Sequence, residues 1–270
     1  MATITRVSVG RTSMIGRVFE HRFLSYRRTF RASIFSSFLN PVLFLTAMGI
    51  GLGSYVDSAA DTAALGGVSY LQFLAPGLLA ATCMQSAAFE ATFPIMSGLL
   101  WSRIFHAMHA TPIGSRDIAL GNVAWFTARL LVIATVFTFV IVLFGAAASP
   151  TVVFAIPAGV LTGLAFATPI AAFAATQTTP SKFNAVFRFG ITPLFLFSGT
   201  FYPISSLPQP LQVLAWFTPL FHGVELTRAL SLGTVADDPL AAVIDVVYLT
   251  TMFAIGLFFM VRLIRRRLVR

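Results

Sequence analysis

Hydrophobic residues along this chain gather in long runs separated by short polar stretches. The runs cover residues 40–55, 71–100, 118–144, 151–175, 183–201 and 240–263. A helix needs about 20 predominantly apolar residues to cross the hydrocarbon core of a bilayer, and the longer runs reach that length with few charges. The pattern therefore predicts an all-α membrane protein with six transmembrane helices.

The segment before the first run predicts an amphipathic helix over residues 11–36. Its apolar stripe comprises Ile15, Phe19, Phe23, Tyr26, Phe30 and Ile34, and its other side carries Arg17, Arg27, Arg28 and Arg31. A helix of this kind lies in the membrane interface with its arginines near lipid phosphates, although a soluble amphipathic helix shows the same pattern. Because a predicted span follows directly, we expect residues 1–37 to form a cytoplasmic interfacial segment and residues 38–270 the transmembrane domain.

A proline-rich stretch, residues 202–239, separates the fifth and last runs. It contains two brief apolar runs, 211–217 and 220–232, flanked by prolines. Neither run is both long enough and free enough of charge to span a bilayer. Short apolar segments broken by proline are typical of re-entrant or interfacial helices.

Composition strengthens the membrane assignment. Of the 270 residues, 57% are hydrophobic and only 10% are charged, with a mean hydropathy of +0.86, whereas about a quarter of a soluble domain is charged. The net charge of +9 does not indicate nucleic-acid binding, because most basic residues cluster before the first run and at the C-terminal end. The single cysteine, Cys83, excludes a disulfide framework and a cysteine-based metal site.

The loop charges predict the orientation. With six spans both termini share one side, which also receives Arg103, Arg116, Lys182 and Arg188. The opposite side receives the acidic residues Asp57, Asp61, Glu225, Asp237, Asp238 and Asp245, and its only basic residue is Arg228. Basic loops face the cytoplasm, so we expect both termini to be cytoplasmic.

A short cytoplasmic loop, residues 101–117, mixes apolar and basic residues. Ile104, Phe105 and Met108 alternate there with Arg103, His106 and His109. A helix of this composition can dock into a groove on a partner protein, and an ordinary interfacial loop remains the alternative. His106 and His109 lie one turn apart, but no third ligand for a metal follows nearby.

Glu90 and Arg129 are the ionisable residues deepest in the predicted spans. At about 1.5 Å of rise per residue, they reach similar depth in neighbouring helices. Charges at this depth usually pair inside a bundle, so we predict a Glu90–Arg129 ion pair that joins two helices and responds to gating. A protonated Glu90, or one facing a water-filled path, is the alternative.

On the opposite side, His222, Glu225 and Arg228 follow each other at helical spacing. They are candidates for an extracytoplasmic gate along an exit path, or for a bridge between two copies of the chain. The plainer interpretation is that these three polar side chains simply pair with one another at the membrane interface. Aromatic residues nearby fit an interfacial belt better than a sugar-stacking site.

The chain lacks the residues of the enzyme classes that such a sequence suggests. The glycine-rich phosphate loop of an ATPase is missing, because the only lysine, Lys182, stands in Thr-Pro-Ser-Lys without glycines. Asp237–Asp238 is an isolated acidic pair, without the second acidic motif that a metal-dependent prenyl transferase requires. Ser198–Gly199 lacks the Gly-x-Ser-Gly arrangement of an intramembrane serine protease. We therefore expect no catalytic residue, metal or cofactor in this chain.

Four stretches give the chain a specific resemblance to a known family. In order they are FLAPGLLA from Phe73, HAMHATP from His106, FGITPLFLFSGTFYPI from Phe189, and the segment from Leu207-Pro to Thr218-Pro-Leu-Phe-His-Gly-Val-Glu-Leu-Thr-Arg. They resemble ABC-2-type transport permeases, particularly the branch of nodulation-factor or lipooligosaccharide exporters and daunorubicin-type drug exporters. The resemblance covers most of the chain but does not choose a substrate.

The resemblance implies a six-helix bundle in the bacterial inner membrane, paired with a second permease copy or paralogue. Separate ATPase subunits would bind ATP and Mg²⁺. The family places a coupling helix at the position of Arg103, Phe105, His106, His109, Thr111 and Pro112. Substrate would pass between two permeases, beside the second and fifth spans.

Three functions therefore compete. The first is an export permease for a lipid-linked saccharide, glycolipid or amphipathic drug. The others are a non-transporting membrane scaffold or assembly subunit, and an intramembrane enzyme. A co-purifying ATPase distinguishes the first from the others.

Overall fold

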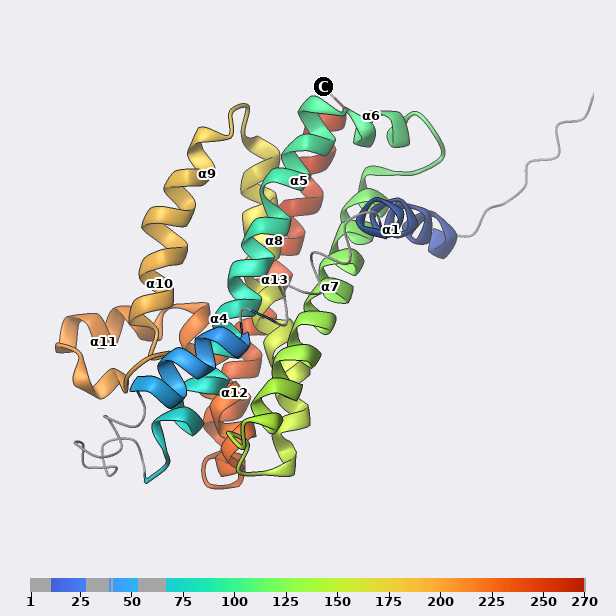
Figure 1. Cartoon of the computed structure of the whole chain (residues 1–270). Coiled ribbons are helices and arrows are strands. Elements are labelled where there is room, and N and C mark those ends of the chain that lie inside the picture. The colour runs from blue at the N-terminus through green and yellow to red at the C-terminus, as the bar shows by residue number, and fades with distance from the viewer. Residues whose placement is uncertain (1–10, 28–38, 40, 53–66, 270) are drawn as a thin grey trace, which may run out of the picture.

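The computed structural model describes residues 11–27, 39, 41–52 and 67–269. Every regular element within these ranges is helical, which confirms the predicted all-α class. Figure 1 shows long helices running side by side along one direction, with shorter helices lying across them. The described part of the chain is therefore a helical bundle with crossing helices attached to it.

Three helices in the described ranges are long and apolar enough to cross a membrane. They are α7 (Ser115–Leu143), the turn η4 (Pro150–Phe154) continued by α8 (Ala155–Thr176), and α13 (Pro239–Leu268). Each begins and ends within a few residues of a predicted span, apart from the longer C-terminal end of α13. Asp238 caps α13 by accepting a hydrogen bond from the Ala241 amide, and Pro239 fits the first turn because it needs no amide partner there.

Helix α8 occupies the centre of the bundle. It packs against α4 (Tyr70–Ala91), α7, α12 (Pro219–Leu232) and α13. Small residues permit this close approach: a Cβ added to Gly163 would lie 2.6 Å from Leu130, and one added to Gly256 of α13 would lie 2.5 Å from Pro169. In lipid, where water does not drive helices together, such small residues allow backbones to pack closely.

The second predicted span, residues 71–100, is segmented rather than continuous. α4 ends at Ala91, and α5 (Phe93–Met96) and the π-helical turn η3 (Ser97–Trp101) follow. Thr92 interrupts the helix with φ −96° and ψ −88°. The interruption has a local cause, because Pro94 has no amide hydrogen with which to extend the hydrogen bonding of α4.

The fifth predicted span, residues 183–201, is also segmented and ends earlier than expected. It consists of α9 (Ser181–Val186), the π-helical turn η5 (Phe187–Ile191) and α10 (Thr192–Phe197). Pro193 follows the wide turn, and prolines and wide turns are common causes of kinks. Figure 1 shows α9 and α10 as a column beside the main bundle.

The first predicted span, residues 40–55, is described only in part. Residues 41–52 are helical and end in the π-helical turn η1 (Leu45–Leu52), which packs against α4. Residues 40 and 53–55 lie outside the described ranges. The count of six spans therefore stays a prediction.

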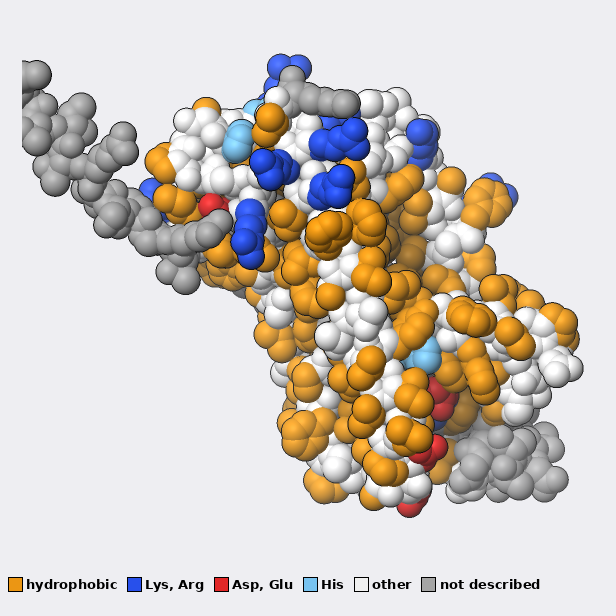
Figure 2. Space-filling view, turned by 180° about the vertical axis from the view of Figure 1, so that it is seen from behind, with side chains coloured by type: hydrophobic (Ala, Val, Ile, Leu, Met, Phe, Trp, Pro, Cys, Tyr) orange, Lys and Arg blue, Asp and Glu red, His pale blue; other side chains and the backbone are white. Residues whose placement is uncertain are grey.

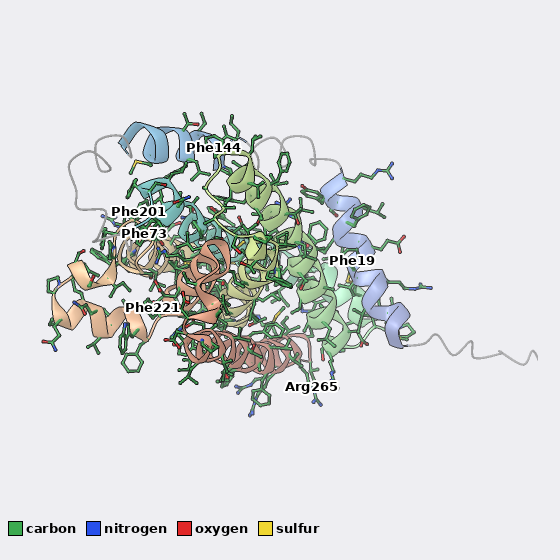
Figure 3. All side chains as sticks on the ribbon, turned by 90° about the horizontal axis from the view of Figure 1, so that it is seen from below. Phe19, Phe73, Phe144, Phe201, Phe221 and Arg265 are labelled. Carbon is green, nitrogen blue, oxygen red and sulfur yellow. The ribbon has the colours of Figure 1, made fainter. Side chains whose placement is uncertain are left out.

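The N-terminal helix α1 (Arg11–Arg27) lies across α7, and the remainder of its predicted length, residues 28–36, lies outside the described ranges. Val18 is buried against α7, where a Cβ on Gly121 would lie 2.5 Å from it. Viewed along the bundle in Figure 3, Phe19 on α1 lies on the opposite side from Phe73, Phe201 and Phe221.

The two ends of the bundle differ in charge. Figure 1 places the C-terminal end of α13 beside α6 (Ile104–His109), and Figure 2 shows lysine and arginine side chains gathered at this end. The opposite end carries η6 (Ile204–Ser206), α11 (Gln209–Trp216) and η7 (Thr234–Ala236), with acidic side chains visible near it. Asp57 and Asp61, expected on the acidic side, lie outside the described residues. We refer below to the basic end and the acidic end.

Candidate functional site

The loop predicted to dock on a partner forms α6 at the basic end. Phe105 is 2% exposed and inserts against η3, where a Cβ on Gly98 would lie 2.6 Å from its ring. Arg103 precedes α6 with φ 50°, a left-handed conformation that non-glycine residues rarely adopt. The sharp turn lets α6 lie across the end of the bundle while Phe105 anchors it.

The predicted coupling residues divide into two groups in the structure. Arg103, His106, Thr111 and Pro112 are exposed, so they are available to a partner. Phe105 and His109 turn inward, and His109 Nδ1 is buried. The side chain of Thr111 donates a 2.6 Å hydrogen bond to the Met108 carbonyl, which holds the turn after α6.

A buried polar contact attaches α1 to α7. Arg22 donates from Nε and Nη2 to Oδ1 of Asn122, at 2.9 and 2.6 Å, and Asn122 is fully buried. The Arg22 guanidinium also lies 5.8 Å from the centre of the Phe105 ring. Burial lowers the pKa of Arg22 from its ordinary value, and the negative charge of Glu90 opposes that shift. One side chain thus contacts both α7 and the anchor of α6.

The structure brings Glu90 and Arg129 together between α4 and α7. Arg129 Nε lies 3.3 Å from Glu90 Oε1, and the Trp125 indole donates a 3.1 Å hydrogen bond to Glu90 Oε2. The Nε–H of Arg129 is not aimed at the carboxylate, so the contact is an ion pair without a hydrogen bond. Arg129 also lies 4.3 Å above the Tyr26 ring of α1, so the pair connects three helices.

At the acidic end, Arg228 is buried and fully engaged. It donates from Nη1 to Glu225 Oε1 and from Nη2 to the Gly199 carbonyl, both at 2.7 Å, and from Nε to the Phe73 carbonyl at 3.3 Å. Its guanidinium also lies 3.8 Å from the centre of the Phe73 ring. Arg228 therefore joins α12 to α4 and to the loop after α10, while Glu225 remains partly exposed.

His222, predicted to act with Glu225 and Arg228, instead faces α13. Its Nδ1 lies 2.7 Å from Asp245 Oδ1, and its Nε2 lies 2.9 Å from the Trp216 carbonyl at the end of α11. The imidazole stacks on the Tyr248 ring with 4.0 Å between centres. The structure brings together only two of the three predicted gate residues, Glu225 and Arg228.

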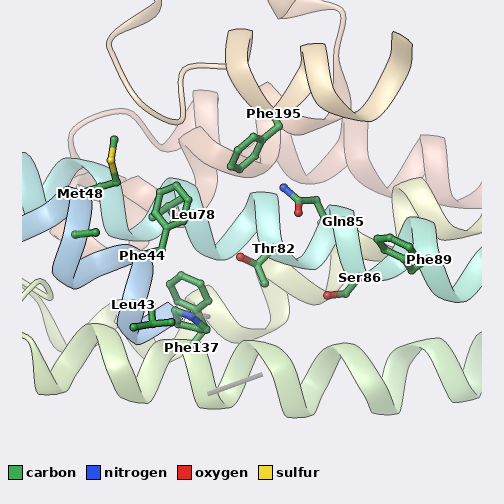
Figure 4. A pocket seen from close by; sticks show the side chains of 12 residues that line it. Leu43, Phe44, Met48, Leu78, Thr82, Gln85, Ser86, Phe89, Phe137 and Phe195 are labelled. Carbon is green, nitrogen blue, oxygen red and sulfur yellow. The ribbon is translucent and has the colours of Figure 1, made fainter. Parts of the chain in front are cut away.

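A groove of about 620 Å³ opens beside α4 and is a candidate binding site. Thr82, Gln85 and Ser86 project into it from α4, and Figure 4 shows these polar groups between Phe195 of α10 and Phe137 of α7. The remaining wall is apolar and comes from Pro41, Leu43, Phe44, Ala47, Met48, Leu78 and Phe89. A polar stripe between aromatic walls suits an amphipathic molecule.

No cluster of three or more candidate metal ligands occurs within the described ranges. His106 and His109 also differ in burial.

Three side-chain contacts were not predicted from the sequence: Arg22 with Asn122, Trp125 with Glu90, and Asp245 with His222. A signal existed for Arg22, because it shares the buried side of α1 with Val18 and Tyr26 at four-residue spacing.

Comparison with known proteins shows the family of this chain. A model of the ABC-2 type transporter family matches residues 15–232. Nodulation protein J of Sinorhizobium fredii is 32% identical over 254 residues, covering 93% of this chain and 92% of that protein. Nodulation protein J of Rhizobium leguminosarum bv. viciae is 30% identical over 256 residues, covering 94% of each chain.

A more distant relative is the inner membrane transport permease YadH of Escherichia coli, 26% identical over 206 residues, or 76% of this chain and 79% of that protein. The family match spans most of the chain, including most of α1, all of α6, the groove beside α4 and the α11–α12 segment. The chain therefore belongs to the ABC-2 type transporter family.

Proposed function

We propose that this chain is the membrane-spanning permease of an ATP-driven exporter that moves an amphipathic molecule out of the cytoplasm. The substrate is a lipid-linked saccharide, a glycolipid or an amphipathic drug. Separate ATPase subunits bind and hydrolyse ATP, and a second permease copy or paralogue completes the path. In this proposal residues 1–37 form the interfacial segment and residues 38–270 the transmembrane domain of a bacterial inner-membrane protein.

The groove beside α4 carries the proposal. A chain that only anchors other proteins in the membrane has no need of Thr82, Gln85 and Ser86 lining a cavity at the level of its apolar helices. Polar groups in an apolar environment are costly without partners. A substrate with a polar head and an apolar tail supplies those partners and also covers the phenylalanine walls.

Transport by the reconstituted complex tests this assignment. The permease is co-purified with its ATPase, inserted into lipid vesicles, and assayed for ATP-dependent movement of a fluorescent short-chain glycolipid. Gln85→Leu and Thr82→Val should each lower the transport rate while ATPase binding persists. Thr251→Val is the matched control, because Thr251 is exposed on α13 away from the groove. Equal transport by the groove variants and the control would overturn the assignment.

The orientation rests on the charge difference between the two ends. The basic end faces the cytoplasm under the positive-inside rule, which leaves both termini and α6 inside. Single cysteines at Thr111, just after α6, and at Ser206, the last residue of η6, test this in a Cys83→Ser background, since both residues are exposed. A membrane-impermeant thiol reagent should label Ser206→Cys in intact cells and Thr111→Cys only after lysis.

The α6 loop transmits the ATPase cycle in this proposal. Its exposed residues contact the ATPase, and its buried Phe105 connects that contact to η3 and Arg22. ATP binding then shifts the bundle between two states through the ATPase, as far as its differential affinity allows. Changes at Arg103, Phe105 or Thr111 should raise the ATP hydrolysed per molecule transported. Normal transport by all three variants, with ATPase binding intact, would remove the coupling role.

A further inference from the structure

The α11 helix at the acidic end is attached to the bundle by few groups. Of its own residues only Ala215 is buried, and Trp216 and the following Phe217 are 64% and 73% exposed. The last carbonyls of a helix have no partner within it and need one from outside. Here His222 contacts the Trp216 carbonyl, and the Tyr248 hydroxyl donates to the Phe217 carbonyl at 2.5 Å. These two side chains fix the end of α11 to α12 and α13.

The His222 contact requires a particular number of protons. The Trp216 carbonyl can only accept a hydrogen bond, so Nε2 must carry hydrogen at the observed 2.9 Å. The contact between Nδ1 and Asp245 Oδ1 at 2.7 Å needs a second proton between those atoms. The His222–Asp245 pair therefore makes both contacts only when it holds two protons, whichever residue carries the shared one.

Loss of one proton breaks the contact with α11. The single remaining imidazole hydrogen is drawn to the negatively charged Asp245, because a charge-assisted hydrogen bond is the stronger of the two. Nε2 then presents a bare lone pair to the lone pairs of the Trp216 carbonyl. That contact changes from attractive to repulsive, while the Tyr248 hydrogen bond is unaffected because a tyrosine hydroxyl keeps its proton throughout the range in which histidine titrates.

Other charges around the pair are accounted for. On α12, Glu225 is paired with Arg228. On α13, Asp238 precedes the pair and caps the helix. Helices α8 and α11 and the turn η4 carry no ionisable side chain. The ionisable residues of α4 are Tyr70, Cys83 and Glu90, and Glu90 is held by Arg129 and Trp125.

We propose that the His222–Asp245 pair is a proton-operated latch for α11. With two protons it holds the end of α11 against α12, and with one proton it loosens that end, which is then left to the Tyr248 hydrogen bond and the stacking of Trp216 on Phe221. The latched state is present at low pH and is lost as pH rises through the apparent pKa of the pair. The latch is a property of the fold at the acidic end and holds whether or not the chain exports the substrate proposed above.

Nitrogen NMR of the full-length protein in lipid tests the proton count directly. The chain has four histidines, so a His222→Gln variant identifies the signals of His222 by difference. Spectra are taken from about pH 5 to about pH 9, a range that brackets the ordinary histidine pKa of about 6.5. The Nε2 signal should be that of a protonated nitrogen at low pH and of a bare nitrogen at high pH.

A distance measurement tests the release of α11. Spin labels at Val213 of α11 and Ile244 of α13, both exposed, are introduced in a Cys83→Ser background. The distance distribution should be narrow at low pH and should broaden or lengthen as pH rises. His106→Gln is the matched control, because His106 is exposed at the other end of the bundle, and it should leave the pH response unchanged.

Two variants at the latch separate the proton mechanism from a general loosening. Asp245→Asn can donate from its amide to Nδ1 of a neutral His222, which leaves Nε2–H for the Trp216 carbonyl, so α11 should stay attached at every pH. His222→Ala should give the broad, loosened distance distribution at every pH, because only the Tyr248 hydrogen bond remains. The proposal is overturned if Asp245→Asn keeps the wild-type pH response, or if wild-type Nε2 stays protonated with an unchanged distance throughout.

Discussion

Arg228→Lys keeps the positive charge but removes the planar guanidinium, whose separate nitrogens contact different partners. The Arg228 guanidinium presents separate nitrogens to the Glu225 carboxylate and the Gly199 carbonyl, each at 2.7 Å. A lysine has one nitrogen on a flexible stem and cannot occupy both positions. We expect it to keep the contact with Glu225, where the charges attract, and to leave the buried Gly199 carbonyl without a donor.

The expected loss follows from the contacts. A hydrogen bond to a charged group contributes about 1.5–3 kcal/mol, so losing the Gly199 contact should destabilise the protein by about that amount. The Nε contact with Phe73 is long at 3.3 Å and adds little. Arg228→Ala removes every contact, including those with both carbonyls and the Phe73 ring, so its loss should exceed that of Arg228→Lys; Glu225 is partly exposed, so water screens its charge once the cation is gone.

Thermal unfolding, followed through the reactivity of Cys83, measures these losses of stability. Cys83 is the only cysteine and is fully buried, so a thiol-reactive dye becomes fluorescent only when the bundle opens. At about 2–4 °C per kcal/mol for a chain near this size, Arg228→Lys should lower the apparent Tm by about 3–12 °C. Arg228→Ala should lower it further. All variants are compared at one scan rate, because membrane proteins of this kind need not refold.

The control is Arg188→Lys. Arg188 is exposed and its guanidinium lies 5.8 Å from the centre of the Phe189 ring, so the change should alter stability by no more than about 0.5 kcal/mol. If the apparent Tm of Arg228→Lys equals that of this control, the contacts of Arg228 do not hold α12 to α4. The same conclusion follows if the apparent Tm of Arg228→Ala is higher than that of Arg228→Lys.

Three further predictions concern contacts inside the bundle. Gly98→Ala should push Phe105 out of its place against η3, because the new Cβ would lie 2.6 Å from the ring; overpacking of about 1–3 kcal/mol should lower the Cys83-detected Tm and weaken ATPase co-purification. Gly256→Ala should lower the same Tm by separating α13 from α8, since its Cβ would lie 2.5 Å from a proline ring. Glu90→Arg and Arg129→Glu should each reduce the monodisperse fraction in size-exclusion chromatography, and the double exchange should recover part of it.

Controls for these changes come from the chain itself. Gly16→Ala adds a methyl group to α1 with nothing within 4 Å, so its Tm and its ATPase co-purification should equal those of the wild type. Adding Phe105→Leu to Gly98→Ala should restore part of the Tm by making room for the new methyl group. A double charge exchange no better than either single change would show that Glu90 and Arg129 do not stabilise each other.

The sequence determined the helices of this protein and most of their limits. Apolar runs with little charge predicted α7, α8 and α13, and the capping groups near their ends act locally: Ser69 and Gln72 cap the start of α4, and Asp238 caps α13. Prolines such as Pro94 carried the information that the second run would be segmented, because a missing amide hydrogen acts within one turn. The depth of Glu90 and Arg129 was also readable, since helical rise is constant.

Only the tertiary structure decided which polar groups meet. His222 and Arg228 lie on one helix, and six residues at 3.6 per turn turn the second about 120° away from the first. One therefore faces α13 and meets Asp245, 23 positions along the chain, while the other faces α4 and meets Phe73 and Gly199. Periodicity fixes the faces of each helix, but the rotation of a helix against its neighbours depends on packing along its whole length, which no local pattern encodes.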